Sequence, residues 1–156
     1  MFVSTLKALG AAALLSSVTV AGATAAELTH DIYAKGTIPV TINLSGVEVA
    51  DGPIYIMVQK REEYRGMKGH GAILKTATPG NMTAIIKVAE PGDYSVSVWH
   101  DADNDMVFDM DEAYRPTEGW GASGNAPTGR MPTFDDVKIK VESFGTTIDV
   151  PMVYPT

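Results

Sequence analysis

Apolar and polar residues alternate one by one along most of this sequence, and the alternation restricts the chain to β-structure. From Ile38 to Leu44 every second residue is aliphatic, and the residues between are Pro, Thr and Asn. Successive side chains of a strand point to opposite faces, so this pattern predicts a strand with one buried face. The same pattern predicts five further strands at 54–58, 82–88, 94–98, 137–141 and 148–152, and a short seventh at 72–76.

Turn-forming residues separate the predicted strands. Gly stands beside Ser, Asp, Pro or Asn at 45–46, 51–53, 79–81 and 91–93. No stretch of a dozen residues has a helical period, although 62–68 is compatible with one helical turn. Short strands at regular spacing, with no helices to cover parallel crossovers, favour an all-β protein. We predict an antiparallel β-sandwich of about seven strands, immunoglobulin-like or transthyretin-like.

One connection between strands is much longer than the others. It runs over residues 101–133, and it contains an acidic stretch followed by a Gly-rich segment with Trp120. Loops of this length are rare in compact domains unless they carry a function. Loops at one end of a sandwich often hold the binding residues, so we place the candidate site in this connection.

The N-terminus has the features of an export signal. Lys7 supplies a positive charge, 8–21 is apolar, and Ala23-Thr24-Ala25 is a small-residue cleavage site. We therefore predict a signal peptide at 1–25, a flexible lead-in at 26–35 and one β-sandwich domain at 36–156. The location would be periplasmic or secreted, with no membrane insertion after cleavage.

Charge and cysteine content limit the partners and the means of stabilisation. The chain has 12 basic and 19 acidic residues, for a formal net charge of −7. Such a surface repels nucleic acid, so we expect a protein or carbohydrate ligand instead. There is no Cys. The folded domain must therefore depend on core packing, or on a bound metal ion.

The acidic stretch 101–112 has the spacing of a calcium-binding loop. In an EF-hand loop of about twelve residues the ligands stand at positions 1, 3, 5, 7, 9 and 12, and position 7 contributes a backbone carbonyl. Ca²⁺ takes about six to eight oxygen ligands, which alternate carboxylates in a short loop can gather. We therefore predict a structural Ca²⁺ site formed by Asp101, Asp103, Asp105, Val107, Asp109 and Glu112.

Met106 departs from this pattern. It occupies the sixth position, where the sharp turn normally requires Gly because the left-handed conformation is unfavourable for a residue with a Cβ. We therefore expect weak to moderate affinity for Ca²⁺.

Several residues around the loop are candidates for a ligand surface: Trp99, His100, Tyr114, Glu118 and Trp120. His100 shares the inward parity of the preceding strand, so it is either a buried, hydrogen-bonded histidine or, with Asp101 and Glu118, the centre of a hydrolase-type enzyme. Trp99 and Trp120 either bind carbohydrate or pack, with Trp99 covered by the segment containing Gly119 and Gly121. Tyr94 is expected to be a core residue whose hydroxyl bonds to the preceding turn.

Four ordered motifs resemble a known family: Pro91 to Asp101, the acidic stretch, Pro116 to Gly121 and Pro132 to Asp136. Together they are similar to the bacterial exported domain-of-unknown-function family 2141, and the likeness extends from Gly36 to Tyr154. Members tend to have Gly at the position of Met106 and Tyr at that of Trp120. The resemblance implies a small extracytoplasmic β-sandwich and brings no activity or catalytic residue. We accordingly expect a non-enzymatic binding protein with a calcium loop.

Overall fold

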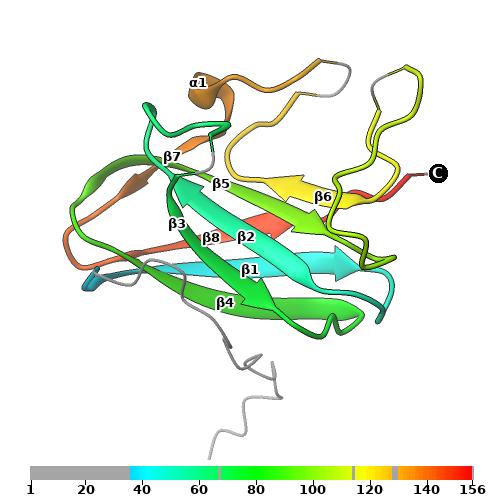
Figure 1. Cartoon of the computed structure of the whole chain (residues 1–156). Helices are drawn as coiled ribbons and strands as arrows, with labels where there is room; N and C mark the ends of the chain where they lie inside the picture. Colours follow the sequence, from blue (N-terminus) through cyan, green and yellow to red (C-terminus); the bar gives the residue numbers. More distant parts are fainter. Residues whose placement is uncertain (1–35, 67, 114, 128–129, 156) are drawn as a thin grey trace, which may run out of the picture.

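Two β-sheets packed face to face form the structure, which is a computed structural model (Figure 1). It describes residues 36–155 except Met67, Tyr114 and residues 128–129. The predicted signal peptide and lead-in lie outside the described residues. Within the described part of the chain, no helix is both long and apolar enough to cross a membrane.

Three strands make the smaller sheet, in the order β4-β1-β8: β1 is Ile38–Val47, β4 is Gly80–Val88 and β8 is Thr146–Pro151. The larger sheet has the order β3-β2-β5-β6, and β7 also pairs with β5. Its strands are β2 (Ile54–Gln59), β3 (His70–Leu74), β5 (Gly92–His100), β6 (Gly119–Ala122) and β7 (Lys138–Val141). A single turn of helix, α1 (Phe134–Val137), precedes β7.

The six strands predicted from alternation are confirmed, and the short seventh lies at 70–74. The structure differs from the prediction in four places. Val137, predicted to open the strand at 137–141, is instead the last residue of α1. β8 runs parallel to β1, whereas the other pairs are antiparallel. β6 was not predicted because two of its four residues are Gly, which is depleted in strands. Residues 61–65 form turns rather than a helical turn.

The core lies between the sheets and consists of the alternating residues of both. Val40, Ile42 and Ile54 are fully buried, and their neighbours in β1 and β2 are partly exposed. Val96 of β5 is fully buried as well. Tyr94 is buried at 1% exposure, and its hydroxyl donates a hydrogen bond to the carbonyl of Glu90 at 2.8 Å. This confirms its predicted role. Its pKa is raised, chiefly because burial disfavours the phenolate.

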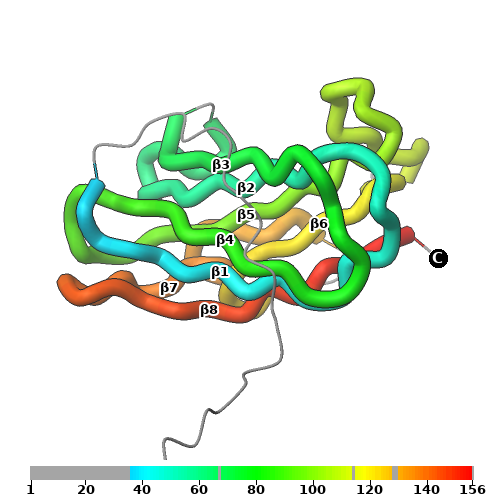
Figure 2. The backbone as a smooth tube through the Cα atoms, turned by 90° about the horizontal axis from the view of Figure 1, so that it is seen from below, coloured from blue at the N-terminus to red at the C-terminus, as the bar shows by residue number. Residues whose placement is uncertain are grey.

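The strand ends determine where the long connection lies. It leaves the end of β5 and returns into β6, at the same end of the sandwich as the C-terminus (Figures 1 and 2). The C-terminal segment is tied to β6 by two backbone hydrogen bonds between Trp120 and Val153. The turn between β7 and β8 lies at the opposite end in both views.

Candidate metal centre

The first residue of the acidic loop is held by the end of β5 and by the turn before β2. The backbone N–H of Asp101 donates to the carbonyl of Pro53 at 3.0 Å, which extends the pairing of β2 with β5 by one residue. Gly52, with φ of +69°, packs against the carbonyl of Asp101, and a Cβ there would collide with this oxygen. The side chain of Asp101 is completely buried. The loop therefore starts from a fixed point.

Local hydrogen bonds then fold the chain back over the Asp101 carboxylate. Its Oδ1 accepts from the N–H of Asp105 at 3.0 Å, and its Oδ2 accepts from the N–H of Met106 at 3.2 Å. Asp105 in turn accepts from the N–H of Val107 at 2.8 Å. Asn104 and Met106 have φ values of +60° and +64°. Met106 thus adopts the left-handed conformation that the loop pattern requires at this position, although it carries a Cβ.

The fold-back brings three carboxylates together. One oxygen from each of Asp101, Asp103 and Asp105 can be chosen so that all three lie within 4.8 Å of one another. Asp101 is at the base of the group, while Asp103 and Asp105 are exposed. Carboxylate oxygens at this separation suit a hard divalent cation. The structure thus groups the first half of the predicted ligand set.

The second half of the set is arranged differently. Residues 109–113 and 115–117 belong to a small hairpin, which is closed by hydrogen bonds from the N–H of Thr117 to the carbonyl of Asp109 and from the N–H of Asp111 to the carbonyl of Arg115. Glu112 is exposed in the tip of this hairpin, and neither it nor Asp109 belongs to the three-aspartate group. An EF-hand returns its last ligand through a helix, whereas this hairpin does not.

Asp111 stabilises the hairpin tip. Its carboxylate accepts hydrogen bonds from the backbone N–H groups of Ala113 and Arg115 and from the Arg115 guanidinium. The backbone bond from Arg115, followed by its side-chain bond, lowers the pKa of Asp111. Asp111 is therefore an anchor of the hairpin.

His100 is a satisfied buried histidine. Its Nδ1 lies 2.7 Å from the hydroxyl of Tyr154, and its Nε2 lies 2.7 Å from the carbonyl of Asp51. A carbonyl can only accept, so Nε2 carries a proton, and in the neutral imidazole Nδ1 accepts from the hydroxyl of Tyr154. Burial raises the pKa of that tyrosine. Both ring nitrogens are thus occupied, which leaves none free to act as a general base.

Strand parity also separates His100 from the two acidic residues proposed to act with it. His100 is opposite Gly119 in the β5–β6 pairing, on the core side of the sheet. Asp101 and Glu118 are the adjacent residues on the two chains, so their side chains leave the opposite face. The geometry therefore gives no support to an enzyme centred on these three residues.

Trp99 lies within an aromatic cluster on the outer face of the larger sheet. Its ring stacks on Tyr55 with centroids 4.7 Å apart, and Phe108 of the acidic loop meets it edge-on at 6.0 Å. Its indole N–H donates to Glu118 Oε2 at 2.6 Å. One ring face of Trp99 is therefore covered, which favours packing over carbohydrate stacking. Trp120 is its cross-strand neighbour and is half-buried.

The residues that cover Trp99 were not those expected. Gly119 and Gly121 instead face the C-terminal segment: a Cβ on Gly119 would collide with the ring of Tyr154, and one on Gly121 would lie 2.9 Å from the carbonyl of Pro151. Tyr55 and Phe108 were missed by the sequence analysis. The contact between Tyr55 and Trp99 could have been predicted from the outward parity of Tyr55 in β2, where it pairs with Trp99. Tyr114 lies outside the described residues.

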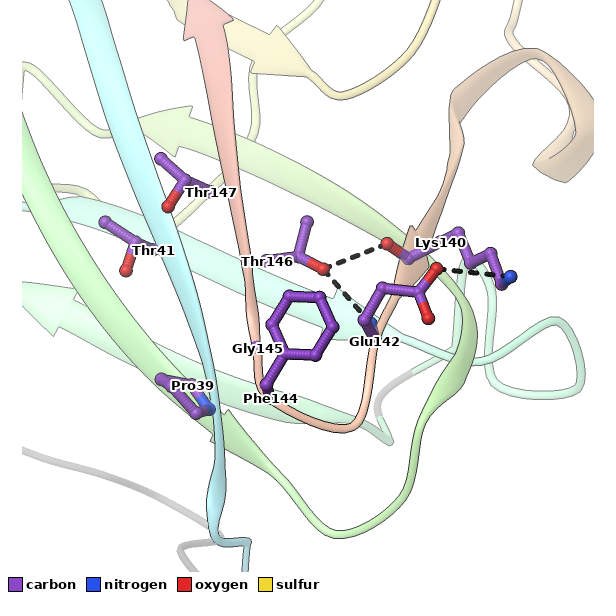
Figure 3. A pocket seen from close by; sticks show the side chains of 8 residues that line it. All are labelled: Pro39, Thr41, Lys140, Glu142, Phe144, Gly145, Thr146 and Thr147. Carbon is purple, nitrogen blue, oxygen red and sulfur yellow. Dashed lines mark hydrogen bonds and ion pairs between the residues drawn. The ribbon is translucent and has the colours of Figure 1, made fainter.

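A shallow hollow of about 460 Å³ lies at the other end of the sandwich, beside the β7–β8 turn (Figure 3). Thr146 Oγ1 is hydrogen-bonded to the backbone of Lys140 and Glu142, and these two side chains form an exposed ion pair. Phe144 is 83% exposed beside them. The charged groups of the hollow are thus paired with each other, and the hollow is remote from the acidic loop.

Comparison with known proteins identifies one family. The family described as "Uncharacterized protein conserved in bacteria (DUF2141)" matches residues 42–149, which include all the described strands except the ends of β1 and β8. No curated protein and no solved structure matches the chain.

Proposed function

Because this chain belongs to the bacterial DUF2141 family, whose description assigns no activity, we propose a function from its own geometry: it is an exported, non-enzymatic β-sandwich whose acidic loop binds Ca²⁺. The ion would be held by Asp101, Asp103 and Asp105. The observation that carries this proposal is that oxygens of all three carboxylates lie within 4.8 Å of one another.

Charge repulsion favours a cation among these groups. Two like charges about 4 Å apart repel by about 1 kcal/mol in bulk water, and by more where water is partly excluded, as around the buried Asp101. Backbone N–H groups offset part of this repulsion, but each carboxylate oxygen has a second lone pair free for an ion. A bound cation would offset most of the remainder.

The donor set favours Ca²⁺ over other metals. All three grouped side chains offer oxygen, and no His belongs to the group. Oxygen ligands suit Ca²⁺ and Mg²⁺, whereas transition metals favour imidazole or sulfur. A loop without rigid octahedral geometry suits Ca²⁺, which accepts irregular coordination and completes its shell with carbonyls and water. The carbonyl of Val107 remains our predicted backbone ligand.

The same loop presents an apolar surface that the ion would organise. Met106 is 75% exposed and Val107 is 53% exposed, while Phe108 and Met110 are each 38% exposed. Adjacent apolar residues at a loop tip are typical of an interaction site. Neutralising the carboxylates beside them would favour a protein or carbohydrate partner that does not itself supply positive charge. Export to the periplasm or beyond, where free Ca²⁺ is available, is part of this proposal.

Calorimetric titration of Ca²⁺ into chelator-treated protein, with melting curves in both conditions, tests the proposal. We expect one-site binding and a higher melting temperature in Ca²⁺. Asp103→Asn should abolish the Ca²⁺-dependent shift without lowering the melting temperature in chelator, because Asp103 is exposed, makes only one long backbone contact, at 3.3 Å, and repels the neighbouring carboxylates when no ion is bound. Asp101 is a poorer choice, because its carboxylate also holds the fold-back.

The matched control is Glu62→Gln, which removes one exposed negative charge from the turn after β2, at the end of that strand remote from Asp101, and should leave the shift intact. Absence of both heat and melting shift in the unmodified protein would refute the proposal. If both variants lost the Ca²⁺-dependent shift equally, the shift would be a general effect of net charge and not of binding at the three aspartates.

A further inference from the structure

Glu118 is a buried carboxylate with one oxygen that the protein does not satisfy. The residue is only 8% exposed, and Oε1 has no hydrogen-bond partner among the described residues. Buried carboxylate oxygens normally have partners, because removing them from water is unfavourable. The other oxygen, Oε2, is well used: it accepts from the indole N–H of Trp99 at 2.6 Å and from the backbone N–H of Asp109 at 3.4 Å.

The sheet register directs this carboxylate to the acidic loop. β5 and β6 pair Trp99 with Trp120 and His100 with Gly119, and the pairing ends there. Continuing the same register by one residue would set Glu118 opposite Asp101. Side chains of facing residues lie on the same side of an antiparallel pair. Asp101 and Glu118 are both buried there. The contact with the Asp109 N–H brings the Glu118 carboxylate against the same acidic stretch that carries the three aspartates.

We infer that Glu118 is the remote carboxylate of the cation site and accepts, through Oε1, a hydrogen bond from a water bound to the ion. This inference rests on the proposed function. Direct ligation is not assigned to Glu118, because its oxygens are not part of the group within 4.8 Å. A water donates to the oxygen that lacks a partner and also belongs to the shell of Ca²⁺, which commonly includes water.

This assignment replaces the one that loop spacing suggested. Spacing makes Glu112 the last ligand, but Glu112 is exposed in the hairpin tip. Glu118 comes six residues later and is brought back by the β5–β6 pairing instead of by an exiting helix. The site is therefore composite, with aspartates from one loop and a carboxylate from the segment that enters the neighbouring strand.

Trp99 gives the inference an optical signature. The carboxylate that would bind the hydrated ion also accepts the indole N–H of Trp99. Polarising one oxygen changes the hydrogen bond at the other, so Ca²⁺ should alter the fluorescence of Trp99 through Glu118. Trp120 has no contact with Glu118 among the described side-chain hydrogen bonds, so Trp120→Phe leaves Trp99 as the reporter.

Ca²⁺ is titrated into the chelator-treated unmodified protein and into the Glu118→Gln and Glu112→Gln variants. Calorimetry measures the affinity of each, and Trp99 fluorescence is recorded for the same proteins in the Trp120→Phe background. Loss of an outer-shell partner weakens metal binding by about 10–100-fold, so we expect a loss in that range for Glu118→Gln together with loss of the fluorescence change. Glu112→Gln removes the same charge from an exposed position and should change affinity by less than about twofold.

Unchanged affinity in Glu118→Gln, or a comparable loss in Glu112→Gln, would overturn the inference while leaving Ca²⁺ binding by the aspartates in place. Absence of binding in the unmodified protein would instead overturn both proposals. If Glu118→Gln does not fold in chelator, Glu118→Asp decides the matter. It keeps the charge but withdraws the carboxylate by one methylene, so unchanged affinity in that variant would also overturn the inference.

Discussion

Met106→Gly tests whether the acidic loop stores backbone strain. Met106 has a φ of +64°, and its side chain is 75% exposed. Removing the side chain therefore costs little packing, and the substitution acts mainly on the backbone. Gly adopts this conformation freely, whereas a residue with a Cβ does not.

The left-handed conformation costs a residue with a Cβ about 1–2 kcal/mol. Gly gives the unfolded chain more freedom, which opposes this gain by about 0.4–1 kcal/mol. We therefore expect Met106→Gly to raise the free energy of unfolding by roughly 0.5–1 kcal/mol. For a domain of this size the melting temperature would rise by about 2–5 °C.

Two matched variants of the same loop isolate the conformational effect. Asn104 has a φ of +60°, but Asn tolerates this region better, so Asn104→Gly should gain less. Val107 is exposed and is not among the residues with positive φ, so Val107→Gly should lose stability. Urea unfolding in chelator and in Ca²⁺ measures all three. A loss for Met106→Gly as large as that for Val107→Gly would refute the strain argument.

Three further predictions address the surrounding structure. Tyr154→Phe leaves the buried Nδ1 of His100 without a donor and should destabilise the protein by about 1–3 kcal/mol in urea unfolding, whereas Tyr55→Phe, whose hydroxyl has no described hydrogen bond, should have little effect. Equal losses would contradict the assigned role of His100. Gly52→Ala should lower the melting temperature more than Gly80→Ala. Both glycines have a positive φ, but only Gly52 packs against the Asp101 carbonyl. Comparable losses would show that this close approach is unimportant. The Arg130 guanidinium, with Thr133, holds the pKa of Asp136 well below its ordinary value of 3.8. The ionised Asp136 carboxylate therefore contributes fully to stability above that pH, and the contribution is lost as the pH falls below it. Asp136→Asn should thus flatten the decline of the urea midpoint below about pH 4. An unchanged decline would contradict the pairing.

Local patterning was sufficient for most of the strands and for the first half of the candidate site. Alternation in β1, β2, β4 and β5 located four of the strands because burial of one face leaves a period of two in the sequence. β6 left no such signal, since two Gly residues contribute no side chain to the pattern. The pairing of β8 with β1 was equally invisible, because strand direction depends on which strands become neighbours in space.

The candidate site likewise has one part that the sequence predicts and another that it does not. Spacing alone grouped Asp101, Asp103 and Asp105, because ligands two residues apart are brought together by one turn of chain. Spacing also pointed to Glu112, where a hairpin takes the place of the helix that the pattern assumes. The contacts of Glu118 with Trp99 and with the N–H of Asp109 depend on the pairing of β5 with β6. The sequence by itself thus determined most of the strands and the chemistry of the loop. Only the tertiary structure decided that the distant Glu118 carboxylate contacts this loop, because that proximity is created by strand pairing and not by separation along the chain.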